Sequence, residues 1–121
     1  MAIAEEGRTA VIVAAEPTEA GLAAVLLEES DLAVVDLTPG GDLMAFLEDH
    51  ADEVALVFAD AGRIRRGQLA AVRTRWPRLP VVVSGGIHDV EIADSRTQRL
   101  SKPWRPLELL VAAERARRAT G

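Results

Sequence analysis

Short apolar runs separated by polar turns organise this chain. Four runs are rich in β-branched and other apolar residues and have the length of strands buried on both faces. A fifth, weaker run follows near the end of the chain. The expected strands cover residues 9–15, 32–37, 54–59, 79–84 and 99–101.

Segments with apolar residues at helical spacing lie between these runs. Thr18 is expected to cap the first helix, whose first turn carries Glu19, and Asp42 to cap the second. Gly67 is expected to begin the third, and Pro106 fits the first turn of the last. The residues expected to face the core are Leu22, Val25 and Leu26 in the first helix, Leu43, Phe46 and Leu47 in the second, Leu69, Val72 and Trp76 in the third, and Leu107, Leu110 and Val111 in the last.

Together with a short helix expected over 89–94, this order gives five strands that alternate with five helices. Alternation with short connections predicts an α/β fold, in which a parallel sheet is covered by helices on both faces. A length of 121 residues corresponds to one domain, which is expected to span 1–121.

Composition narrows the class of protein. No apolar run approaches the roughly 20 residues of a membrane span, and the amino terminus lacks the pattern of a signal peptide. The chain contains no cysteine, so neither a disulfide framework nor a thiolate metal site is expected. We therefore expect a cytoplasmic protein without membrane contact.

Charge is distributed unevenly along the chain. Residues 1–62 carry one basic and fourteen acidic residues, a net charge of −13, whereas residues 63–121 carry thirteen basic and five acidic residues, a net charge of +8. Such asymmetry can indicate nucleic-acid binding. However, the basic residues are scattered and the aromatics are few, which favours solvated or mutually facing charges and no nucleic-acid partner.

Three polar residues stand at the carboxyl ends of the last three expected strands: Asp60, Ser84 and Lys102. The carboxyl ends of parallel strands form the usual ligand site of such sheets, so the three are expected to converge. There, a carboxylate could attack a phosphoryl group while a hydroxyl and an ammonium hold its oxygens. Alternatively, Asp60 merely caps a turn and Lys102, the single lysine, lies on the surface.

These motifs resemble those of bacterial response-regulator receiver domains over nearly the whole chain. LVFAD at 56–60 resembles the receiver strand that ends in the phosphoacceptor aspartate, and LSKPW at 100–104 resembles its lysine–proline–aromatic motif. RWPRLPVVVSGG at 75–86 resembles the approach to the fourth strand, with Ser84 where the family has Ser or Thr. VIVAAEP at 11–17 resembles the opening strand. The resemblance implies a flavodoxin-like fold with five parallel strands in the order 2-1-3-4-5.

The departures from the family concern the metal site first. Receivers usually hold Mg²⁺ with two acids after the first strand, where this chain has Ala14 and Ala15. Mg²⁺ prefers carboxylate ligands, so its binding is expected to be weak at most. Glu16 could reach the site only if the turn allowed it. Without those acids, a direct ion pair between Asp60 and Lys102 is expected.

Other departures concern the output surface. Arg99 stands where receivers carry the switch Tyr or Phe, and Ile64 replaces a common proline. The short segment between Ser84 and Lys102 predicts a stunted fourth helix. Three arginines flank Ile64 and are either solvated or available to attract phosphate: Arg63, Arg65 and Arg66.

Histidine chemistry receives little support from the sequence. His50 and His88 lie on different segments, and neither has a ligand partner at metal spacing. His50 is expected to serve the end of the second helix, and nothing around His88 favours phosphohistidine chemistry.

The leading hypothesis is a stand-alone, atypical receiver without an output domain, acting as a signalling or interaction module with impaired or absent phosphorylation at Asp60. Its expected partners are a histidine kinase, a phosphotransfer protein or another signalling protein, and a homodimer is compatible with it. The alternative is a working phosphorelay receiver, which catalyses at most its own phosphorylation on Asp60. A small-molecule-binding α/β domain ranks last, because no glycine-rich phosphate loop follows the first strand.

Overall fold

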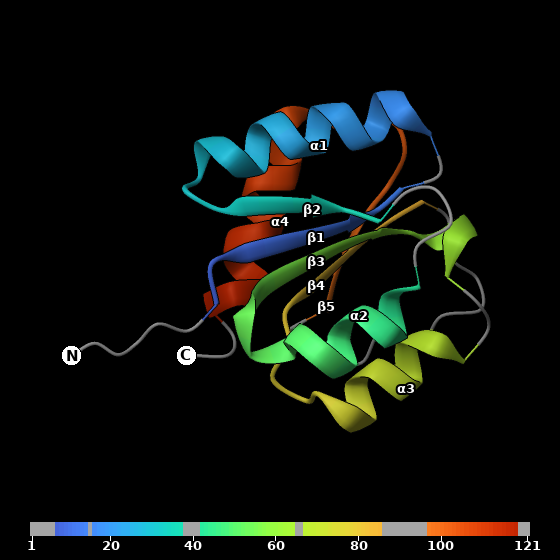
Figure 1. Cartoon of the computed structure of the whole chain (residues 1–121). Coiled ribbons are helices and arrows are strands. Elements are labelled where there is room, and N and C mark those ends of the chain that lie inside the picture. Colours follow the sequence, from blue (N-terminus) through green and yellow to red (C-terminus); the bar gives the residue numbers. More distant parts are fainter. Residues whose placement is uncertain (1–6, 15, 38–41, 65–66, 86–96, 119–121) are drawn as a thin grey trace.

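A computed structural model of the chain describes residues 7–14, 16–37, 42–64, 67–85 and 97–118. Five strands alternate with helices and short 3₁₀ turns in this part of the chain (Figure 1). The elements are β1 (Thr9–Val13), α1 (Pro17–Glu29), β2 (Ala33–Asp36), α2 (Leu43–His50), η1 (Ala51–Glu53), β3 (Val54–Asp60), η2 (Ala61–Arg63), α3 (Gln68–Arg75), β4 (Val81–Ser84), β5 (Thr97–Leu100) and α4 (Pro106–Arg118).

All five strands are parallel and form one sheet in the order β2-β1-β3-β4-β5. The fold class and strand order expected from the sequence are therefore confirmed. Paired residues fix the register at the centre of the sheet: Ile12 lies beside Phe58, and Asp60 lies beside Ser84. The last pair places two of the three candidate polar residues side by side at the carboxyl edge.

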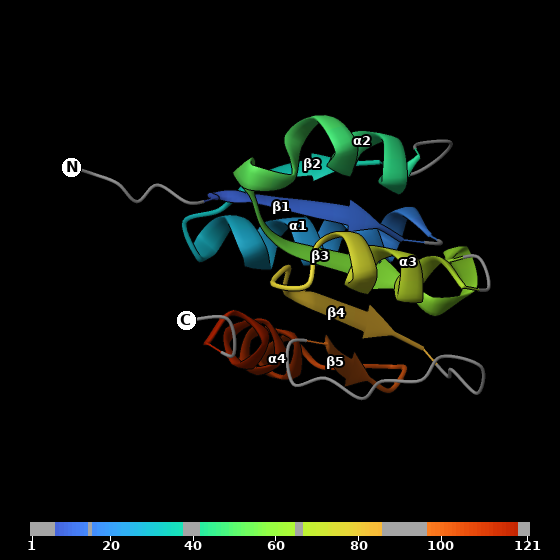
Figure 2. The ribbon, with the colours of Figure 1, turned by 90° about the horizontal axis from the view of Figure 1, so that it is seen from below.

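Helices cover both faces of this sheet, α1 and α4 on one and α2 and α3 on the other (Figures 1 and 2). Alternate residues of a strand point to opposite faces, so Ile12 and Phe58 pack under α1 and α4 while Val11 and Val57 pack under α2 and α3. Because both faces are buried, the central strands are apolar throughout, as the continuous runs in the sequence predict.

The helix starts follow the sequence in part. Asp42 caps α2, and its Oδ1 accepts hydrogen bonds from the backbone N–H groups of Met44 and Ala45 at 3.0 and 3.3 Å. Gly67 precedes α3 with a positive φ of 81°. The cap expected at Thr18 is wrong: α1 begins at Pro17 after Glu16, because proline suits the first helical position.

The inward faces of α1 and α4 also differ from the expectation. Leu22 and Val25 of α1 are exposed, as are Leu107 and Val111 of α4. The core-facing residues are Ala20, Ala23, Leu26 and Leu27 in α1, and Leu109, Ala112, Ala113 and Ala116 in α4. Alanines allow the helices to approach the sheet closely. Because alanine is small and only weakly apolar, a prediction based on large apolar side chains misses this face.

Several expectations concern residues outside the described part of the chain: Ala15, Arg65, Arg66, His88, the turn at 38–41 and the short helix at 89–94. Within the described part, no helix is both long and apolar enough to cross a bilayer.

Candidate functional site

The carboxyl edge of the sheet gathers the polar residues that the sequence singles out. Asp60 ends β3 and Ser84 ends β4, and both are buried. Lys102 follows β5 and turns back toward β3, where its Nζ donates a hydrogen bond to Oδ2 of Asp60. The expected ion pair between Asp60 and Lys102 is therefore present.

Asp60 uses its two carboxylate oxygens differently. While Oδ2 contacts Lys102, Oδ1 accepts a hydrogen bond from the backbone N–H of Gly62 at 2.6 Å and so caps the 3₁₀ turn η2. A Cβ on Gly62 would lie 3.0 Å from that oxygen, so glycine permits the close approach. Asp60 thus both caps a turn and faces the polar cluster, and the two sequence readings are not exclusive.

A residue that sequence reasoning assigned only to the helix end completes the cluster. Glu19, in the first turn of α1, points toward the sheet edge, and its side chain is only 11% exposed. Its Oε2 accepts hydrogen bonds from the hydroxyl of Ser84 at 2.9 Å and the indole N–H of Trp104 at 3.0 Å. Its Oε1 lies 3.6 Å from Nζ of Lys102.

Lys102 consequently lies between two carboxylates. The pKa of its amine is raised above the usual 10.5, chiefly by the hydrogen bond to Asp60. Partial burial opposes this effect, and the negative charge of Glu19 reinforces it. The ammonium is thus the local counter-charge for both Asp60 and Glu19.

The connection after β5 carries the lysine, proline and tryptophan of the LSKPW motif. The Lys102–Pro103 peptide bond is cis. The ring of Trp104 packs edge-on against Phe58 of β3, with ring centroids 5.7 Å apart, while its N–H reaches Glu19. The aromatic residue of the LSKPW motif therefore links the core to the polar cluster.

The remaining candidates lie elsewhere. Glu16 is exposed at the start of α1, and Arg63 is exposed at the end of η2. Arg99 is exposed on β5. His50 ends α2, its ring lies beside that of Phe46 with centroids 4.6 Å apart, and its Nδ1 lies 3.5 Å from Oε1 of Glu53. None of these four residues contacts Asp60 among the interactions of the described residues.

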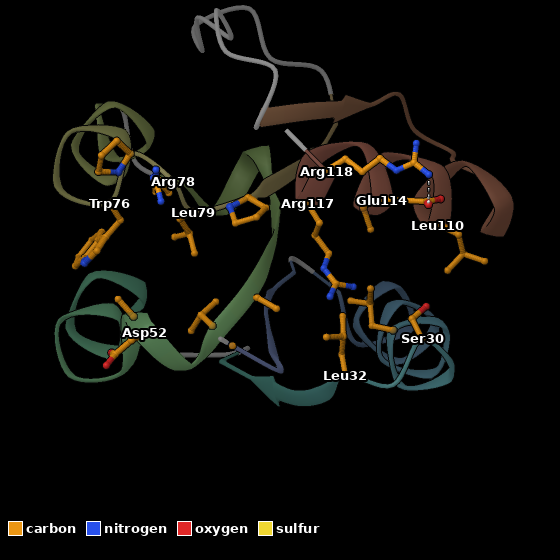
Figure 3. Close-up of a pocket in the computed structure, with 18 of the residues that line it drawn as sticks. Ser30, Leu32, Asp52, Trp76, Arg78, Leu79, Leu110, Glu114, Arg117 and Arg118 are labelled. Carbon is orange, nitrogen blue, oxygen red and sulfur yellow. Dashed lines mark hydrogen bonds and ion pairs between the residues drawn. The ribbon is translucent and has the colours of Figure 1, made fainter. Parts of the chain in front are cut away.

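A large cavity lies at the opposite end of the sheet. It has a volume of about 1230 Å³ and is lined by α4, by the connection between α3 and β4, by η1 with the start of β3, and by residues around the end of α1 (Figure 3). Arg117 points into it, and Arg118 pairs with Glu114 at 3.1 Å on its rim. No residue of the Asp60 cluster lines this cavity, so size alone does not mark the candidate site.

Solved structures with the same fold are response-regulator receiver domains. A receiver protein from Sinorhizobium medicae matches with a TM-score of 0.79 at 17% identity, over 98% of this chain and 100% of that one. A receiver domain protein from Clostridium thermocellum matches with a TM-score of 0.74 at 17% identity, over 91% of this chain and 94% of that one. This chain therefore has the flavodoxin-like fold of receiver domains.

A longer protein matches as well. NtrX from Brucella abortus, in complex with ADP, matches with a TM-score of 0.74 at 24% identity, over 94% of this chain but only 27% of the NtrX chain. Neither a protein-family profile nor a curated protein sequence matches this chain.

Proposed function

We propose that this chain is a receiver-type signalling module of two-component regulation in which metal-dependent phosphorylation of Asp60 is weak or absent. The observation that carries the proposal is the position of Lys102. Its ammonium pairs with both Asp60 and Glu19, and β1 is followed there by Ala14. Its partners would be a histidine kinase, a phosphotransfer protein or another signalling protein, recognised through the exposed faces of the fold.

The residues at this edge do not fit the Mg²⁺ ion that receivers use. Mg²⁺ requires several oxygen ligands in near-octahedral geometry. Ala14 is fully buried and offers only a methyl group, and the two carboxylates already share one ammonium. No three potential ligand residues of the acidic, histidine or cysteine types cluster within the described ranges. On this proposal, Asp60 would not have a tightly held cation to neutralise charge during phosphoryl transfer.

The test uses beryllofluoride, a mimic of the phosphoryl group, with excess Mg²⁺. We expect no saturable change in the ¹H–¹⁵N resonances around Asp60 of the unmodified chain. Saturable, Mg²⁺-dependent changes at Asp60 and Ser84 would overturn the proposal, because they would show that the two missing acids are dispensable. The Asp60→Asn variant controls for binding elsewhere.

A specific observation favours a second function, that of a working phosphorelay receiver. Asp60 and Ser84 are partners in the β3–β4 register, and Lys102 donates to Asp60, so an acceptor carboxylate lies beside two donors. In such a reaction, a carboxylate oxygen of Asp60 would form a bond to phosphorus. The bond from phosphorus to the donor's histidine nitrogen would break, and that nitrogen would keep the electron pair.

Acetyl phosphate, a small phosphoryl donor, distinguishes the two functions by intact mass. A phosphorylated species that disappears in Asp60→Asn but persists in Asp42→Asn would establish the relay function. We expect no phosphorylated species from the unmodified chain under the same conditions. Asp42 is a matched control because it is another aspartate whose asparagine variant keeps the helix cap.

A further inference from the structure

Glu19 reaches the site because of where α1 begins. The helix starts at Pro17, so its first turn lies at the carboxyl edge of the sheet. Glu19, Ala23 and Leu26 are spaced i, i+4 and i+7 and share the inward face of the helix, since residues at this spacing lie on one side. A carboxylate is thereby carried inward on the same face that packs against the sheet.

The contacts of Glu19 use donors that can serve only one acceptor. The Ser84 hydroxyl and the Trp104 indole each have a single proton to donate, and both donate to Oε2 of Glu19. Ser84 is fully buried, so water does not compete for that proton. The ammonium of Lys102 lies on the other oxygen of the same carboxylate at 3.6 Å.

We infer that Glu19 is an internal anion that occupies the donors a phosphoryl group on Asp60 would need. A phosphoryl group bonded to Asp60 would require hydrogen bonds from Ser84 and Lys102, the hydroxyl and the amine beside it. Glu19 already accepts the hydrogen bond from the Ser84 hydroxyl, and its other oxygen draws on the charge of Lys102 at 3.6 Å while that ammonium donates to Asp60. The inference rests on the proposed function, because it assumes that Asp60 is the place where an anion would be added.

This arrangement makes Glu19 a positioning residue that fastens three elements together. Through Glu19, α1 is tied to the end of β4 at Ser84 and to the connection after β5 at Lys102 and Trp104. If a second anion took the hydrogen bonds of Ser84 and Lys102, the buried carboxylate of Glu19 would be left with too few donors. Burying a charge without such partners costs free energy. Glu19 would then leave the cluster, and α1 and Trp104 would be released from each other.

The test measures beryllofluoride binding with Mg²⁺ to the unmodified chain and to the variants Glu19→Ala and Glu19→Gln. Removing the competing carboxylate frees at least one charge-assisted hydrogen bond. Binding to Glu19→Ala is therefore expected to become saturable, at least about tenfold tighter than the limit that the unmodified chain sets. Glu19→Gln keeps the size of the side chain and removes its charge, so a smaller gain is expected. Glu28→Gln, an exposed carboxylate on the same helix, is expected to change nothing.

The two tryptophans give an independent readout. In ¹H–¹⁵N spectra without ligand, the indole resonance of Trp104 is expected to move in Glu19→Ala, because its acceptor is lost. The indole resonance of Trp76, at the opposite end of the sheet, is expected to stay in place and so to report that the variant is folded. An unmoved Trp104 resonance in the folded variant contradicts the inference.

The outcomes separate this inference from the function on which it rests. Weak binding to both the unmodified chain and the folded Glu19 variants overturns the inference and leaves the impaired receiver intact. Tight binding to the unmodified chain overturns both. Binding that is weak in the unmodified chain and tight only when Glu19 is replaced supports both the inference and the proposed function. If the tight binding is then lost when Ser84→Ala is added to the Glu19 variant, Ser84 is one of the freed donors.

Discussion

At the scale of single residues, the polar cluster is a set of matched donors and acceptors in a mostly apolar setting. Asp60 and Ser84 could be found from the sequence because each closes an apolar run, and Lys102 because it is the single lysine and stands in the LSKPW motif. Glu19 could not, because an acid in the first turn of a helix is explained equally well by the helix dipole. Only the folded position of α1, with its first turn near the end of β4, shows that Glu19 belongs to the cluster. No local sequence pattern carries that information.

The variant Ser84→Ala tests how much the hydrogen bond between Ser84 and Glu19 contributes to stability. The variant removes a buried donor to a carboxylate, so we expect the free energy of unfolding to fall by about 1–3 kcal/mol. Urea denaturation measures it. Ser30→Ala, which loses only a long 3.3 Å bond to a backbone carbonyl, is the matched control and is expected to change stability by less than about 0.5 kcal/mol.

A double-mutant cycle then assigns that cost to the pair. If Ser84 and Glu19 interact directly, the cost of Ser84→Ala in the Glu19→Ala background should be smaller by at least about 0.5 kcal/mol. Equal costs in both backgrounds would contradict a direct stabilising contact.

At the scale of elements, the strands were predictable and the helix faces were not. Continuous apolar runs mark β3 and β4 without ambiguity, because both faces of these strands are buried. In α4, by contrast, the buried face is Leu109 with three alanines, while the larger Leu107 and Val111 point outward. The spacing of apolar residues in α4 allows either face to be buried. The larger side chains favour the face of Leu107 and Val111, which is the exposed one.

Two leucines of α4 distinguish the observed face from the expected one. Leu109→Ala removes a fully buried side chain and is expected to cost about 2–5 kcal/mol. Leu107→Ala, at a position that is 69% exposed, is expected to change stability by less than about 0.5 kcal/mol. Thermal or urea unfolding measures both, and equal costs would show that α4 packs differently.

At the scale of the whole molecule, ion pairs join the acidic first half to the basic second half. Lys102 contacts Glu19 and Asp60, and Arg75 of α3 contacts Glu48 of α2 at 2.8 Å. Mutually facing charges, one of the two explanations offered for the sequence asymmetry, are therefore present at both of these places. The fold itself followed from the order of strands and helices, because parallel strands joined by helices allow few topologies.

The alkaline limit of stability should depend on one side chain. The chain contains no tyrosine and no cysteine, and Lys102 is its single lysine, so no other side chain titrates between about pH 9 and about pH 12. The pKa of Lys102 is raised in the folded chain, so its contribution is complete below pH 10.5 and is lost as the pH rises through the folded pKa.

We expect that loss to be about 1 kcal/mol or less, because the ammonium side chain is 41% exposed and solvent screens the pair. Denaturation curves recorded across this alkaline range measure it. The Lys102→Met variant should show a flat profile over the same range, and a similar fall in that variant would place the effect elsewhere.

The ammonium held between Asp60 and Glu19 also has a consequence for covalent labelling. Apart from the terminal amine, this chain offers a single primary amine to an acylating reagent. Acylation requires the neutral amine, and the two carboxylates keep this one protonated. Acylation at that nitrogen is therefore slower than at a lysine amine that has no carboxylate beside it.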